Sequence, residues 1–166
     1  MKVLVAGVGN TLRSDDGFGV AVARRLEAMS LPEGVRVVET GISGMTLVQE
    51  LMDGYDALIV MDTVDRGRAP GTVMLIEPDI PDARKMSHDQ QHQLIADTHL
   101  ATPSRVMMMA KAMGSLPERV LLVGCQPVDA ETLGMELSPE VTAAVDVAVA
   151  EVQRHLDHLC TPVVGS

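Results

Sequence analysis

The chain has 166 residues, a length that fits one domain able to bury a sizeable core. Its 46% hydrophobic and 22% charged residues indicate a soluble globular protein, and its net charge of −10 argues against nucleic acid as a partner, because an acidic surface repels phosphates. No apolar stretch approaches the roughly 20 residues that span a membrane, and two cysteines outside any C-x-x-C motif predict reduced thiols and a cytoplasmic protein.

In chain order, the first half of the sequence predicts strands alternating with helices. Residues 2–8 form a continuous apolar run bounded by glycine, which is typical of a buried strand. Residues 15–29 place apolar side chains at helical spacing. A strand at 35–40, a helix at 45–54 and another buried strand at 57–62 follow.

The second half completes the sheet. The link "TVDRGRAPG" is too short for a crossover helix, so the strand at 72–78 is predicted to run antiparallel to its neighbour. Residues 79–98 are long and polar, and we expect a functional loop there. A helix at 100–114, a strand at 119–127 and a final helix that Ser138 caps end the series.

This order predicts an α/β fold, a three-layer sandwich with helices on both faces of a mostly parallel five-stranded sheet that has one antiparallel strand. We expect a single domain over residues 1–160 and a loose C-terminal tail at 161–166. The usual doubly wound order places strand 2–8 beside strand 57–62, with the ligand crevice beyond their carboxyl ends. Residues 10–16 and Asp62 should face that crevice.

The turn after the first strand, "GVGNTLRSDDGFGV", is not a nucleotide-binding loop. A dinucleotide fingerprint needs a third glycine where this chain has Leu12, and no G-x-x-x-x-G-K-[ST] motif exists. Asp15 and Asp16 at the start of the helix could simply stabilise its N-terminus. Asp62 ends an apolar strand, where aspartate is disfavoured. Carboxylates that converge on one pocket must share a proton or bind a cation, so a metal site is the second interpretation.

Histidine could complete such a site. His88 and His92 lie in the polar segment and could be ordinary solvated residues, whereas His99 lies where that segment meets the helix at 100–114. Carboxylate and imidazole ligands together suit nickel, zinc, manganese or iron. Nucleophile motifs such as G-x-S-x-G are absent, and Cys125 is best explained as a small buried apolar residue.

Three stretches resemble the signature blocks of the hydrogenase maturation proteases, in order and over nearly the whole chain. These stretches are "AGVGNTLRSDDGFGV", "YDALIVMDTVDRGRAPGTV" and "ERVLLVGCQPVDAETLGMELSPEV". That family trims the C-terminal extension from the large subunit of [NiFe] hydrogenases. The resemblance implies Asp16, Asp62 and His99 as metal-binding and catalytic residues. It favours His99 over His92, because His99 keeps the family's distance to the "LVG" strand.

The resemblance further implies that nickel arrives with the precursor, that other divalent ions could substitute for it, and that one of the two aspartates could act as a base in metal-assisted hydrolysis. We expect a monomer whose partner is the large-subunit precursor. The alternatives are a nickel-dependent checkpoint or chaperone that does not cleave, another metallopeptidase on a similar fold, or an α/β domain with no site.

Overall fold

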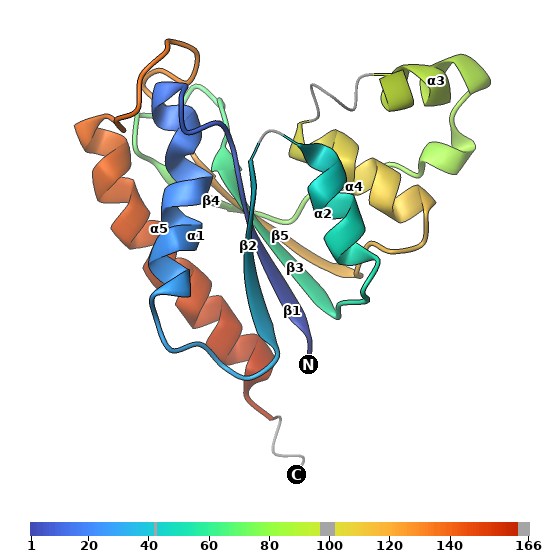
Figure 1. The fold of residues 1–166 in the computed structure, drawn as a ribbon, viewed down its shortest axis with the longest axis horizontal. Helices are drawn as coiled ribbons and strands as arrows, with labels where there is room; N and C mark the ends of the chain where they lie inside the picture. Colours follow the sequence, from blue (N-terminus) through green and yellow to red (C-terminus); the bar gives the residue numbers. More distant parts are fainter. Residues whose placement is uncertain (42, 97–101, 163–166) are drawn as a thin grey trace.

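The computed structural model describes residues 1–41, 43–96 and 102–162, which build a five-stranded sheet covered on both faces by helices (Figure 1). The strands are β1 (Val3–Val8), β2 (Val35–Gly41), β3 (Ala57–Thr63), β4 (Val73–Ile76) and β5 (Arg119–Cys125). Their order is β2-β1-β3-β5-β4, with β4 antiparallel to β5 and the other pairs parallel. The predicted fold class, the antiparallel strand and the β1–β3 pairing are confirmed.

The helices divide between the two faces of the sheet. They are α1 (Phe18–Glu27), α2 (Gly44–Leu51), α3 (His88–Ala96), α4 (Pro103–Ala112) and α5 (Pro139–Cys160), with short 3₁₀ helices η1 (Ser14–Gly17) and η2 (Ala83–Lys85). Helices α1 and α5 cover one face, and α2 and α4 cover the other (Figure 1). No helix among the described residues is long and apolar enough to cross a membrane.

Each buried strand contributes side chains to both faces of the sheet, because neighbouring side chains of a strand point in opposite directions. Val3 and Val5 of β1 pack in the cluster under α1 and α5, whereas Leu4 and Ala6 pack in the cluster under α2 and α4. Both sides of the central strands are therefore dry, which explains their continuous apolar sequences.

Two glycines let α1 approach the sheet at the point where the strand order switches. A Cβ atom on Gly19 would lie 2.1 Å from the carbonyl oxygen of Met61 in β3 and 2.5 Å from that of Val8 in β1. A Cβ on Gly7 would lie 2.4 Å from the Gly19 carbonyl oxygen. The beginning of α1 therefore rests directly on the carboxyl ends of β1 and β3.

The prediction of a loop over 79–98 is wrong for its described part. This segment forms η2 and α3, and reciprocal hydrogen bonds start α3: the Ser87 N–H donates to Gln90 Oε1 at 3.0 Å, and the Gln90 N–H donates to Ser87 Oγ at 3.3 Å. This is a capping box, whose S-x-x-Q pattern is present in the sequence. The helix escaped prediction because its face is too polar to show helical periodicity.

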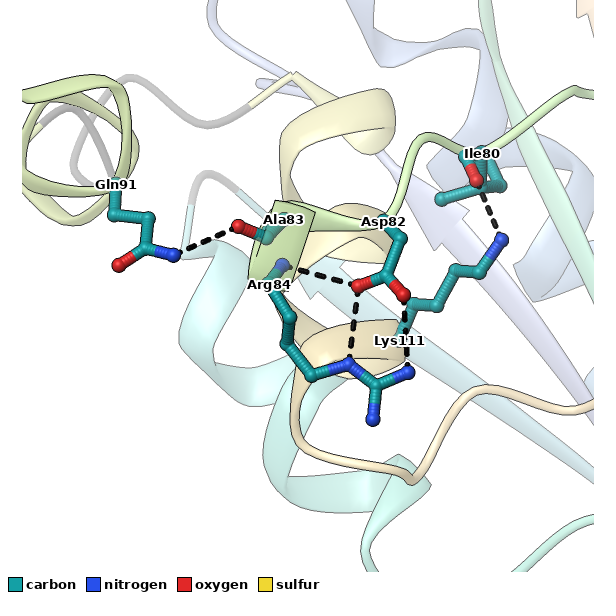
Figure 2. A network of polar contacts seen from close by, with 6 residues as sticks. All are labelled: Ile80, Asp82, Ala83, Arg84, Gln91 and Lys111. Carbon is teal, nitrogen blue, oxygen red and sulfur yellow. Dashed lines mark hydrogen bonds and ion pairs between the residues drawn. The ribbon is translucent and has the colours of Figure 1, made fainter. Parts of the chain in front are cut away.

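Side-chain hydrogen bonds hold this segment together, and one of them joins it to α4 (Figure 2). Asp82 accepts the Arg84 N–H and also receives two bonds from the Arg84 guanidinium, which closes η2. The Gln91 side chain of α3 donates to the Ala83 carbonyl at 3.0 Å, and Lys111 Nζ of α4 donates to the Ile80 carbonyl at 2.6 Å. Among these bonds, the one from Lys111 joins residues 78–96 to α4, and the others lie within the segment.

The other boundaries differ modestly from those predicted. Helix α1 begins at Phe18 and not at residue 15, because residues 14–17 form η1. The last helix begins as predicted: Ser138 Oγ accepts the Val141 N–H at 3.4 Å, and Pro139 occupies the first turn.

Candidate active site

Asp62 lies at the carboxyl end of β3, one residue from the end of the strand. By alternation it shares the face of Leu58 and Val60, and only 9% of its surface is exposed. Its Oδ1 accepts the N–H of Thr63 at 2.8 Å. A buried carboxyl group with so little compensation is costly and needs a functional or structural explanation.

Asp16 comes to the same place from the turn after β1. Its Oδ2 accepts the Asn10 N–H at 2.8 Å, and its Oδ1 lies 3.4 Å from the donating hydroxyl of Thr63. Gly9, at φ +137°, makes this return possible, since a Cβ there would lie 1.9 Å from the Asp16 carbonyl oxygen. Thr63 therefore bonds to both carboxylates, and the structure brings Asp16 and Asp62 together.

Electrostatics couple the two groups. Burial, and then the charge of Asp16, raise the pKa of Asp62 to about 8, while the Thr63 N–H acts in the opposite direction. The hydrogen bonds that the pair accepts from Asn10 and Thr63 come from neutral amide and hydroxyl groups. Two such carboxyl groups hold a proton near neutral pH unless a cation replaces it, and strongly perturbed groups of this kind are typical of functional sites.

Asp15 has a different role from its neighbour. It is 1% exposed and accepts four hydrogen bonds, from the N–H groups of Val128, Asp129 and Ser138 and from the Ser138 hydroxyl. Neither aspartate caps α1 through a side-chain hydrogen bond, because the N-cap residue is Gly17. Asp15 instead joins the first turn to the loop before α5.

Gln126 is a positioning residue that the sequence interpretation missed. It is buried directly after β5; its Oε1 accepts the N–H groups of Arg66 and Arg68, and its Nε2 donates to Asp65 Oδ1 at 2.9 Å. Gln126 thereby fixes the chain that leaves Asp62. The sequence feature that could have identified Gln126 is a glutamine placed directly after a buried strand.

The histidines separate into groups. His88 and His92 are both exposed on α3, with ring centroids 5.6 Å apart. His155 and His158 line a hollow of about 730 Å³ at the amino ends of β3 and β5, the sheet edge opposite the carboxylates. His99 lies outside the described residues, which resume at residue 102, directly before α4. Within the described residues, no three His, Cys, Asp or Glu side chains form a cluster that could hold a metal.

Comparisons with known proteins agree on one family. The family model described as hydrogenase maturation protease matches residues 20–155. A hydrogenase expression/formation protein, HupD, from Rhodobacter capsulatus is 41% identical over 160 residues, which cover 93% of this chain and 71% of HupD.

Two solved structures are similar along nearly their whole length. The hydrogenase 2 maturation peptidase of Thaumarchaeota archaeon SCGC_AB-539-E09 is 36% identical with a TM-score of 0.68, covering 94% of this chain and 98% of that one. The hydrogenase maturating endopeptidase HybD of E. coli is 29% identical with a TM-score of 0.75, covering 96% and 94%.

Proposed function

Because the chain belongs to the hydrogenase maturation protease family and is a hydrolase of the endopeptidase class, we propose that it removes the C-terminal extension of a [NiFe] hydrogenase large-subunit precursor after nickel insertion. The observation that supports this most strongly is the carboxyl pair Asp16–Asp62 at the switch point of the sheet, where α/β proteins bind ligands. In this proposal nickel belongs to the substrate and is not a resident cofactor of the protease.

The carboxyl pair suits a cation that another protein presents. A divalent ion would take the place of the shared proton and relieve the repulsion between the two charges. Asp16, Asp62 and His99 are the proposed ligands, an oxygen and imidazole set that suits nickel and other divalent transition metals. Three ligands leave coordination positions open for groups of the precursor.

The same pair can assist hydrolysis. The cation polarises the scissile carbonyl, and a carboxylate that is not bound to the cation takes a proton from the attacking water. The water oxygen bonds to the carbonyl carbon, the C–N bond breaks, and the proton passes to the departing amine. Either Asp16 or Asp62 can serve as this base when it is not bound to the cation.

Cleavage of a purified nickel-loaded precursor, read by mass spectrometry, tests this function. We expect Asp62→Asn to lower the cleavage rate at least about a hundredfold, because the variant loses a charge that either binds the cation or accepts the proton. His99→Ala should abolish cleavage, and His92→Ala should leave it unchanged. Asp146→Asn, on the exposed face of α5, is the matched control.

The outcomes also separate the rival roles. A wild-type protein that binds the nickel-loaded precursor without changing its mass would be a checkpoint or chaperone. Full activity in Asp62→Asn would remove the proposed role of the carboxyl pair. We propose a monomer that acts in the cytoplasm, a compartment that suits the two free cysteines, Cys125 and Cys160.

A further inference from the structure

Exposed apolar side chains gather on two loops at the carboxyl edge of the sheet. Leu133 is 83% exposed and Met135 is 81% exposed, the highest values for large apolar side chains among the described residues. Leu12 and Val128 are each 53% exposed. We call these four residues the apolar rim. Exposed groups of this kind are costly for a free protein and mark interaction surfaces.

Hydrogen bonds hold the two loops of the apolar rim together. The Gly134 N–H donates to the Leu12 carbonyl at 2.9 Å, and the Ser14 N–H donates to the Gly134 carbonyl at 2.8 Å. The Ser14 hydroxyl donates to the Thr132 carbonyl at 2.8 Å, and Ser14 adopts a φ of +54° that favours glycine. Leu133 and Met135 flank the bonded Gly134, so fixed backbone segments present their side chains.

The apolar rim borders the carboxyl pair. Leu12 belongs to the turn that runs from β1 to Asp16, and its N–H is held by the Asn10 side chain at 2.9 Å. The Asn10 N–H in turn donates to the Asp16 carboxylate. In Figure 1 the turn after β1 and the loop between β5 and α5 lie at the same end of the molecule. A macromolecule that approaches Asp16 from this end of the molecule would meet the apolar rim.

We propose that the apolar rim docks the folded body of the precursor and inserts Leu133 and Met135 into recesses beside its metal-containing pocket. This inference rests on the proposed function. Side chains that protrude from a rigid backbone need recesses in the partner, which a folded domain supplies. An extended peptide is instead held in a groove or along a sheet edge of its receptor, so the folded body and not the C-terminal extension is the proposed occupant.

Steady-state cleavage of the nickel-loaded precursor tests the inference with the double variant Leu133→Ser/Met135→Ser. We expect KM to rise about tenfold or more, with kcat within about twofold of wild type, because docking and not chemistry is impaired. The control Met52→Ser/Val147→Ser removes two exposed apolar side chains outside the apolar rim, one directly after α2 and one in α5. Its kinetics should match those of the wild type. Thermal unfolding verifies that both variants fold.

A binding measurement keeps this inference separate from the proposed function. The trimmed large subunit should bind wild-type protease about tenfold or more tightly than the rim variant, and a synthetic peptide of the extension should not compete. If the wild-type protease failed to cleave, only the proposed function would be refuted. The binding comparison would still test whether the apolar rim is the docking surface. Equal binding and equal KM in the rim variant would overturn the inference. Competition by the extension peptide, or a rim-dependent dimer of the free protease, would also overturn it.

Discussion

Two adjacent aspartates, chemically identical, serve different purposes because of their neighbours. Asp15 is enclosed by N–H and hydroxyl donors from the segment before α5, so its charge is satisfied inside the protein. Asp16 receives one N–H and the weaker Thr63 contact, and it faces another carboxyl group. One residue is therefore satisfied within the fold, and the other is the one that the proposed function assigns to the cation.

Asp15→Ala is predicted to destabilise the protein by about 2–4 kcal/mol, because the variant leaves several buried donors without a partner. Urea unfolding measures the loss. Asp89→Asn, an exposed acid on α3, should change the free energy of unfolding by less than about 0.5 kcal/mol. An Asp15→Ala loss no larger than that of the control would show that the four bonds contribute little.

At the scale of elements, the position of α1 decides where the first turn can go. Its close approach at Gly19 and Gly7 brings η1, and hence Asp16, over the carboxyl end of β3. A helix held farther from the sheet would carry Asp16 away from Thr63 and Asp62. These two glycines, Gly19 in α1 and Gly7 in β1, thus act on the site through the position of the helix.

Gly19→Ala is predicted to lower stability by at least about 1 kcal/mol, although alanine has a helix propensity that is higher by about the same amount. The added Cβ would lie 2.1 Å from the backbone oxygen of Met61, so α1 must shift. Calorimetry measures the change in Tm, and precursor cleavage should fall as well. Val147→Ala, on the exposed side of α5, gains helix propensity without a clash and should not lose stability. A Gly19→Ala protein more stable than wild type would contradict the packing argument.

At the scale of the whole molecule, the acidic protein pays an electrostatic cost for placing two carboxyl groups side by side. Its net charge is −10, and it buries Asp62 next to Asp16. The folded-state pKa of Asp62, about 8, lies above the value of an unfolded chain, about 3.9. Between these values the folded state binds more protons at Asp62 than the unfolded state does. The contribution of Asp62 to stability is therefore full below about pH 4 and is lost as the pH rises toward 8.

We therefore predict that the wild-type protein loses more than about 1 kcal/mol of unfolding free energy between roughly pH 6 and pH 8.5, beyond any loss shared with Asp62→Asn. Urea unfolding in the presence of a chelator measures both proteins. Asparagine keeps the Oδ1 that accepts the Thr63 N–H, so the comparison isolates the charge. Parallel pH profiles for the two proteins would show that Asp62 titrates near its ordinary range.

The sequence by itself determined the fold class, the antiparallel strand, the place of β1 beside β3 and the position of Asp62 near the carboxyl end of β3. These features follow from local signals: apolar runs for buried strands, helical spacing for covering helices, and a link too short for a crossover. The sequence did not predict α3, because this helix has no apolar face. Its one local signal was the capping box at Ser87 and Gln90. The role of His99 stays a prediction.

Only the tertiary structure separated Asp15 from Asp16, identified Thr63 and Gln126 as positioning residues, and brought the backbone of Leu12 beside that of Gly134. Asp15 and its partners Val128 and Ser138 are more than a hundred residues apart in the chain, and Thr63 meets Asp16 across 47 positions. No periodicity or propensity encodes such pairs, because they arise when helices pack on a sheet and bring distant loops to one edge.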